Sequence, residues 1–198
     1  MRNDKIIYDS IKNRKITREF VPNRKIPRNF IFKILDAGRW GPSILGFQPW
    51  EFFVIRNNTL MQKISNEMEV KSQNMKRAHN FVYSIASTIN KAPLLIAVYN
   101  TDAAYTRVKK SDAAFVNVVK KAQLQAIAAA IQNMVLMANS LGLGICWMNM
   151  PIICASEINK ILGIKQKELV AILALGYSHE KSRRFPRKSK NETITFID

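Results

Sequence analysis

Hydrophobic residues recur at helical spacing in several stretches of the chain. Ile6, Ile7 and Ile11 lie on one side of a predicted helix over residues 4–13. Residues 122–141 are apolar around nearly the whole circumference, which is typical of a central buried helix. Further helices are predicted over residues 30–38 with Pro27 in the first turn, over residues 60–90 with breaks, and over residues 156–162, closed by Gly163.

Runs of β-branched, aromatic and aliphatic residues predict strands between these helices. The four core strands are residues 50–55 (WEFFVI), 94–99 (LLIAVY), 144–148 (GICWM) and 169–175 (LVAILAL). Residues 193–197 (TITFI) alternate like an edge strand but have no obvious partner in their own chain. Exposed strand edges pair with other chains, so a homodimer that exchanges C-terminal arms is expected, with a frayed tail as the alternative. The pattern predicts an α+β fold.

Length and composition favour a single domain spanning residues 1–198. Hydrophobic residues make up 47% of the 198 residues, so the chain is able to bury a core without disulfides or a metal. No apolar run approaches the ~20 residues of a membrane span, and the opening MRNDKIIYDS has no apolar signal-peptide segment. We therefore expect a soluble, cytoplasmic protein without a membrane partner.

The chain is strongly basic, and its charge is uneven. The formal net charge is +17. Residues 1–40 hold eleven Lys/Arg and four acids (+7), and residues 181–190 hold six bases and no acid (+6). Three interpretations are open: a nucleic-acid surface, two chain ends that converge on one small phosphorylated ligand, or a solvated basic face.

The cysteines and histidines do not form a metal or disulfide pattern. Cys146 and Cys154 lie eight residues apart with no cluster around them, and His79 and His179 have no ligand spacing. A zinc site, a disulfide framework and a metal cofactor are therefore not expected.

Three segments carry recognisable motifs in a consistent order. They are residues 13–20 (NRKITREF), residues 39–52 (RWGPSILGFQPWEF), and residues 142–147 (GLGICW) followed by residues 176–188. Pro-Ser followed by Gln-Pro-Trp in the second segment is the most specific. Together they resemble the FMN-dependent nitroreductase family over nearly the whole chain. The resemblance implies a central, mostly antiparallel sheet of about four strands flanked by helices, a C-terminal strand donated to the partner subunit, and bound FMN.

The resemblance implies that cations from both ends of the chain meet at the flavin phosphate. Arg14, Lys15 and Arg18 would come from the first motif, and Arg187 and Lys188 from the last. Arginine suits this role because its guanidinium presents paired donors at fixed spacing.

The loop after the second predicted helix would reach the flavin bound mainly by the partner subunit. By position, Pro42, Ser43 and Ile44 would contact the flavin and Gln48 would support the loop. Gly46 stands where the family usually has Asn.

The strand end at residues 148–150 would approach the reactive edge of the flavin ring. Backbone donors of Met148, Asn149 and Met150 would stabilise the reduced ring. The pair Asn149-Met150 replaces a common Gly-Gly. Ile16, in the first motif, is also counted among the cofactor contacts, although the family usually has Ser there.

The implied activity is hydride transfer from NAD(P)H through FMN to a nitroaromatic, quinone or related small acceptor by a ping-pong mechanism. The cofactor carries this chemistry, so no catalytic side chain is assigned. Trp50 is interpreted as a core residue, Glu19 and Glu51 as solvated or salt-bridged, and Gln132 and Asn133 as buried structural polar residues. The alternatives are a flavin-binding protein without turnover and a basic nucleic-acid-binding protein, although no recognised nucleic-acid module is present.

Overall fold

A four-stranded antiparallel sheet forms the centre of the molecule, with its strands in the order β1-β2-β4-β3. The computed structural model describes residues 3–180 and 186–197. The strands are β1 (Trp50–Ile55), β2 (Leu94–Asn100), β3 (Gly144–Met148) and β4 (Glu168–Gly176). The four predicted core strands are thus confirmed to within one residue at each end.

Helices surround this sheet in the described residues. They are α1 (Asn3–Asn13), α2 (Arg28–Arg39), α3 (Asn58–Gln73), α4 (His79–Lys91), α5 (Ala103–Val108), α6 (Ala113–Ser140), α7 (Ala155–Leu162) and α8 (Lys190–Thr193), with 3₁₀ turns η1 (Ile44–Gly46) and η2 (Met150–Cys154). Gly163 ends α7 in the left-handed conformation, with φ 68°, as expected for a helix-terminating glycine. Pro27 precedes α2 as its N-cap, one position before the predicted first turn. No helix among the described residues has the length and apolar character needed to cross a membrane.

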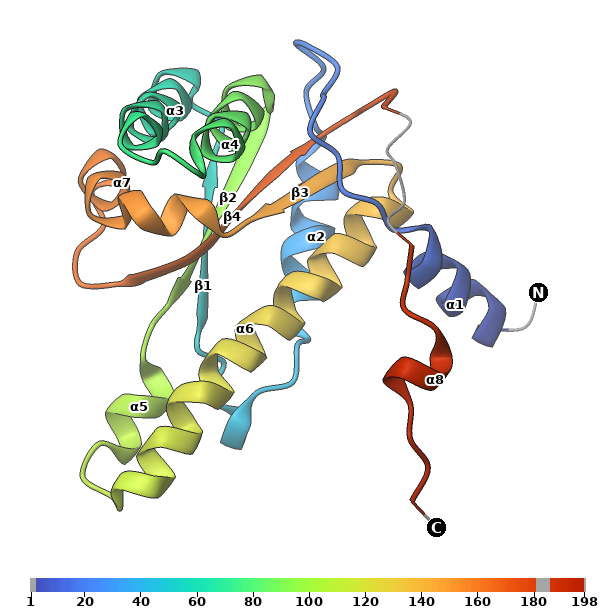
Figure 1. Cartoon of the computed structure of the whole chain (residues 1–198), viewed down its shortest axis with the longest axis vertical. Coiled ribbons are helices and arrows are strands. Elements are labelled where there is room, and N and C mark those ends of the chain that lie inside the picture. Colours follow the sequence, from blue (N-terminus) through green and yellow to red (C-terminus); the bar gives the residue numbers. More distant parts are fainter. Residues whose placement is uncertain (1–2, 181–185, 198) are drawn as a thin grey trace.

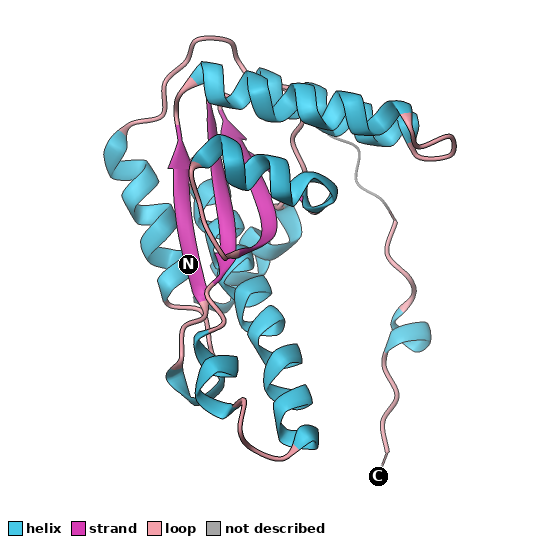
Figure 2. Ribbon diagram, turned by 90° about the vertical axis from the view of Figure 1, so that its left-hand side faces the viewer, coloured by secondary structure: helices cyan, strands magenta, loops and turns pink. Residues whose placement is uncertain are grey.

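Helices cover both faces of the sheet, so each strand contributes to two cores (Figures 1 and 2). Alternate residues of a strand point to opposite faces. In β2, Leu94, Ile96 and Val98 pack with α2 and α6, whereas Leu95 and Tyr99 pack with α3, α4 and α7. All seven residues of β2 are therefore buried, which explains its uninterrupted apolar sequence.

The long helix α6 differs from its prediction in two ways. It begins at Ala113, well before the predicted start at residue 122. Its buried residues lie on the side that faces the sheet, whereas Val118 and Leu124 are exposed. The expectation of a helix buried all round is therefore wrong for the single chain, because only one side of α6 packs against its own sheet.

The C-terminal segment is also different from its prediction. Residues 193–197 do not form a strand within this chain, and Thr193 is the last residue of α8. A capping box starts this short helix: Ser189 Oγ accepts from Glu192 N, and Glu192 Oε2 accepts from Ser189 N at 2.7 Å. The segment lies apart from the sheet in both ribbon views (Figures 1 and 2). Phe196 and Ile197 are almost fully exposed.

Candidate functional site

A cavity of about 480 Å³ lies where the first motif meets β3 and the middle of α6. Its lining comes from segments that are far apart in the sequence. The lining residues are Arg14, Ile16, Gln132, Val135, Ile145, Trp147 and Asn149. The volume lies in the range of small-molecule sites, and the predicted cofactor residues Arg14, Ile16 and Asn149 line it together, so this cavity is the candidate functional site.

Strand β3 directs alternate side chains to this cavity. Ile145 and Trp147 line it, whereas Cys146 and Met148 point to the opposite face and are buried in the other core. Asn149, just beyond the strand, also lines the cavity. Only the backbone of Met148 is therefore available to a ligand here. Met150 packs against the same core as Met148.

The first motif runs alongside β3 at very close range. Thr17 N donates to the carbonyl oxygen of Ile145 at 3.0 Å. A Cβ at Gly144 would lie 2.5 Å from Thr17 Cγ2, so only glycine fits at this position. Thr17 itself is fully buried. Its hydroxyl therefore points into the protein and does not replace, in the cavity, the Ser that the family usually has at position 16.

The two ends of the chain meet beside this motif. The carboxylate of Glu180 accepts hydrogen bonds from the backbone N–H groups of Arg18 at 2.8 Å and Glu19 at 3.1 Å. Lys15 Nζ donates to the Glu180 carbonyl oxygen at 3.0 Å. Ser178 Oγ donates to the Glu19 carbonyl oxygen. These bonds tie residues 15–19 to residues 178–180, the last described before the C-terminal basic run.

The predicted phosphate-binding cations are only partly together. Arg14 lines the cavity, but the Lys15 ammonium is held by Glu180. Burial raises the pKa of the Cys146 thiol on the far face of β3, and the Arg18 charge only partly offsets this rise, so the Arg18 charge acts on that face. Arg187 and Lys188 are exposed. No described contact joins them to Arg14.

The loop of the second motif forms separate cavities. Pro42, Ser43 and Ile44 line one of about 360 Å³ against Gln125 and its neighbours on α6. Gln125 and Gln132 lie two turns apart on the same side of α6, roughly 10 Å along the axis. The first and second motifs therefore do not share a cavity within one chain.

A hydrogen bond and an unusual backbone shape this second loop. Gln48 N donates to Ser43 Oγ at 3.2 Å, so the described contact of Gln48 with the loop comes from its backbone and not from its side-chain amide. Leu45, Gly46 and Gln48 all have positive φ, and Gly46 suits this conformation without strain. Ser43, Gly46 and Gln48 line a further cavity of about 400 Å³ with Trp40 and Arg39.

Sequence reasoning missed part of the cavity wall. The sequence motifs do not point to Trp147, Ile145 or Val135 as site residues, and they predict a buried structural role for Gln132. Gln132 is half-buried and lines the cavity. The alternation of β3 could have paired Trp147 with Ile145 on one face, but the sequence does not reveal that this face is open.

Trp50, Glu19 and Glu51 have the structural roles that the sequence predicts for them. Trp50 is buried in the core on the α6 side of the sheet. Glu19 forms an ion pair with Lys91, and Glu51 forms one with Lys167. Neither glutamate lines the cavity.

The cavity lacks the usual features of acid–base or thiol chemistry. Among the described lining residues, Arg14 is the one that carries a charge. Burial raises the pKa of the Cys146 thiol to about 11, and burial likewise raises that of Cys154 to about 11. Both thiols are therefore neutral near pH 7, and a neutral thiol is a poor nucleophile.

The lining suits a flat, partly apolar ligand with an anionic group. Ile16, Val135, Ile145 and Trp147 offer apolar walls, and Gln132 and Asn149 offer amide donors and acceptors. Arg14 offers a guanidinium to an anion. These residues fit the ring, polar edge and phosphate of FMN.

Known proteins are similar to this chain in sequence and in structure. A protein of Methanothermobacter thermautotrophicus, named provisionally as an NADH dehydrogenase/NAD(P)H nitroreductase, is 28% identical over 153 residues. The match covers 76% of this chain and 66% of that protein, so the chain spans just under two thirds of its length.

Two solved structures share the fold. A BluB-like flavoprotein from Clostridium difficile 630 has a TM-score of 0.84 at 28% identity, over 97% of this chain and 99% of that one. The FMN-dependent nitroreductase NfnB from Mycobacterium smegmatis, in complex with NADPH, has a TM-score of 0.77 at 13% identity, with 100% of both chains covered. The nitroreductase family model matches residues 11–177. By this match and by its fold, the chain belongs to the nitroreductase family.

Proposed function

We propose that this protein is an FMN-dependent oxidoreductase that takes hydride from NAD(P)H and passes it to a nitroaromatic, quinone or related acceptor. The observation that carries this proposal is the cavity beside β3, where Arg14, Gln132 and Asn149 meet apolar walls. Membership of the nitroreductase family supports it. So do the names of relatives that bind FMN or NADPH.

The residues of this chain would bind and orient the cofactor. Arg14 would hold the phosphate, joined by Lys15 after its ammonium leaves the Glu180 carbonyl, and by Arg187 and Lys188 from the C-terminal segment. FMN supplies hydride acceptance and delivery when bound. Backbone N–H groups at residues 148–150 would donate toward the ring, while the apolar walls exclude water.

Donor and acceptor would use the same open side of the site in turn, which gives a ping-pong mechanism. A flat acceptor needs orientation against the ring more than an acid from the protein. The absence of a carboxylate from the described lining agrees with this proposal. The family fold does not define which acceptor is used.

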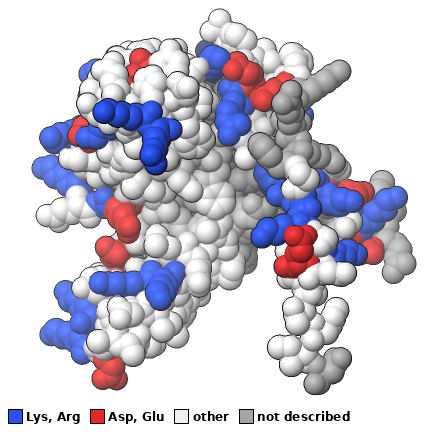
Figure 3. Space-filling model, viewed as in Figure 1, with Lys and Arg blue, Asp and Glu red and all other residues white. Residues whose placement is uncertain are grey.

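We also propose a homodimer, with the loop of residues 42–48 serving the partner's flavin. Phe32, Trp40 and Leu45 are more than two-thirds exposed on α2 and the loop that follows it. In Figure 3, charge gathers over the left side of the molecule and around α1 and α8, whereas the surface over the later turns of α6, beyond Lys121, is largely uncharged. An uncharged, apolar surface of this kind is typical of an interface. The exposed arm of residues 194–197 would complete the dimer by pairing with the partner.

The visible spectrum of the purified protein tests the flavin proposal. We expect bands near ~370 and ~450 nm, from a bound flavin. NADH or NADPH added without oxygen should bleach the longer-wavelength band, and a quinone or nitroaromatic should then restore it. A protein that neither carries nor takes up FMN contradicts the proposal. One that binds FMN but is not bleached by either nucleotide is a flavin-binding protein without this activity.

A further inference from the structure

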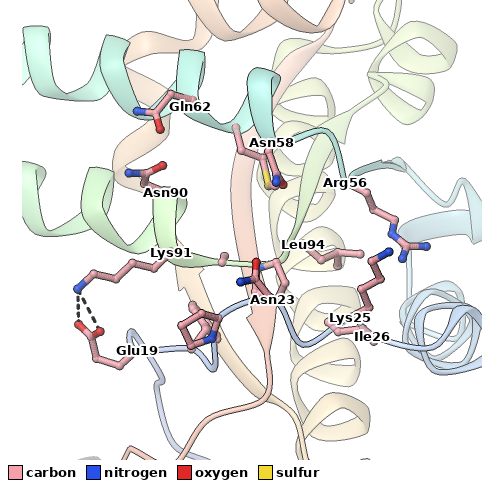
Figure 4. Close-up of a pocket in the computed structure, with 15 residues that line it drawn as sticks. Glu19, Asn23, Lys25, Ile26, Arg56, Asn58, Gln62, Asn90, Lys91 and Leu94 are labelled. Atoms are coloured by element: carbon pink, nitrogen blue, oxygen red, sulfur yellow. Dashed lines mark hydrogen bonds and ion pairs between the residues drawn. The ribbon is translucent and has the colours of Figure 1, made fainter.

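A second large pocket lies away from the candidate flavin site. It has a volume of about 770 Å³ and forms where β1 ends and β2 begins, at the opposite edge of the sheet from β3. Its walls come from the segment of residues 19–26, the first turns of α3 and the end of α4 (Figure 4). The volume is enough for a ligand of mononucleotide size.

The wall formed by residues 21–26 is firmly anchored. The Arg24 guanidinium stacks on the Tyr177 ring at 3.7 Å from its centroid. Val21 N donates to the Tyr177 carbonyl oxygen at 2.7 Å, and Ile26 is buried. Lys25, between Arg24 and Ile26, lines the pocket. The pocket is thus preformed on this side, which lowers the entropic cost of binding.

Two cations at one end of the pocket have no counter-charge. Lys91 at the other end pairs with Glu19, with 2.8 Å between Nζ and Oε1. Within residues 3–180 and 186–197, neither Lys25 nor Arg56 has an acidic partner at ion-pair distance. Their side chains reach toward the same end of the pocket in Figure 4. Two unbalanced cations favour a dianion there, and Arg with Lys is a typical phosphate-binding pair.

The middle of the pocket offers hydrogen bonds above an apolar floor. The amides of Asn23, Asn58 and Asn90 make no hydrogen bond to any described protein group. They are therefore free to bind hydroxyl or amide groups of a ligand. Met61 and Leu94 are buried beneath them. This arrangement suits a polar body with one flat or apolar side.

We propose that this pocket binds a small organic phosphate monoester of about mononucleotide size. Lys25 and Arg56 hold the phosphate, and the asparagines contact the body of the ligand. The pocket shares no lining residue with the cavity beside β3. It therefore binds its ligand while FMN occupies the other site.

Calorimetric titration with 5′-AMP tests this proposal on FMN-loaded protein. We expect one 5′-AMP to bind per chain. Flavin fluorescence should not rise during the titration, because FMN stays bound. Lys25→Ala and Arg56→Ala should each weaken binding by roughly tenfold or more, because each removes a charged hydrogen bond to the phosphate. Lys63→Ala is the matched control. Lys63 is an exposed lysine that neighbours the pocket residue Gln62 on α3 but does not line the pocket, so its loss should leave the affinity unchanged.

Adenosine and inorganic phosphate form the other arms of the experiment. Both should bind much more weakly than 5′-AMP, because each lacks half of the proposed contacts. The proposal is overturned if 5′-AMP does not bind, if it displaces FMN, or if Lys25→Ala and Arg56→Ala bind it normally. It is also overturned if adenosine or inorganic phosphate binds as tightly as 5′-AMP. The flavin-free protein is titrated in the same way. Binding of 5′-AMP there tests this pocket whether or not the protein uses FMN, so the two proposals can fail independently.

Discussion

Thr17 has a buried hydroxyl without a partner among the described groups. Its side chain fills the space left by Gly144. A buried hydroxyl without a hydrogen bond costs free energy, whereas a methyl group of similar size does not. We expect Thr17→Val to raise the free energy of unfolding by about 1 kcal/mol, measured by urea denaturation.

Thr88→Val is the matched control for this change. Thr88 is equally buried, but its hydroxyl donates to the Ser84 carbonyl oxygen at 2.9 Å. The same substitution should therefore lower the free energy of unfolding at Thr88. If Thr17→Val is as destabilising as Thr88→Val, the Thr17 hydroxyl has a partner, such as a bound water.

Arg14 is the one cation that lines the cavity beside β3 in the described chain. If it holds the flavin phosphate, Arg14→Ala should weaken FMN binding roughly tenfold to a hundredfold, the effect of one charged hydrogen bond. Riboflavin lacks the phosphate, so its affinity should be nearly the same in variant and parent. Quenching of flavin fluorescence measures both affinities.

A control and a contrary outcome complete this test. Lys165→Ala removes an exposed cation in the loop after α7 and should not alter the affinity for FMN. If Arg14→Ala weakens FMN and riboflavin alike, Arg14 acts on the ring or on the fold rather than on the phosphate.

At the scale of elements, one buried glutamine joins α5 to α6. Gln123 Oε1 accepts from the backbone N–H groups of Ala104 at 3.1 Å and Tyr105 at 3.0 Å, and its Nε2 donates to Asp102 at 3.3 Å. These are the free N–H groups that begin every helix. Gln123 therefore caps α5 from a neighbouring helix, in place of the side chain of its own N-cap residue, Asp102.

We expect Gln123→Met to lower the free energy of unfolding by about 2 kcal/mol, because two helix N–H groups lose their acceptor. Thermal or urea unfolding measures the loss. Gln125→Met, an exposed position two residues along the same helix, should change stability little. Equal effects of the two substitutions would mean that α5 does not depend on Gln123.

For the whole molecule, the exposed apolar side chains predict self-association. Trp40 is 80% exposed and follows directly after α2. We expect sedimentation velocity at micromolar concentration to give the mass of a dimer, whose interface should exceed roughly 2,000 Å² in total. Trp40→Glu should shift the population toward the monomer, because a buried carboxylate without a partner is costly.

Val70→Glu places the same charge at an exposed apolar position on α3, away from the proposed interface. It should remain dimeric. A monomer that retains its FMN at micromolar concentration, without any substitution, would contradict the dimer proposal.

The sequence by itself determined where the strands lie and which three motifs carry the predicted site residues. Strands β1, β2, β3 and β4 carry continuous apolar runs because both faces of the sheet are covered, and such runs are visible without a structure. The burial of Trp50 and the ending of α7 at Gly163 were visible in the same way. The strands and the helix end are written in short stretches of neighbouring residues, whereas the order of the three motifs along the chain indicated the family.

Only the tertiary structure decided which residues face the cavity and which hold the site together. Gln132 and Trp147 line the cavity because α6 and β3 leave a space between them there. Glu180 fastens the first motif from the other end of the chain. At the C-terminus, the local capping box of Ser189 and Glu192 produced a helical turn where the alternation of residues 193–197 predicted a strand. A strand needs a partner to bond its backbone groups, and residues 3–180 and 186–197 supply none to that segment, whereas the capping box is complete within four residues.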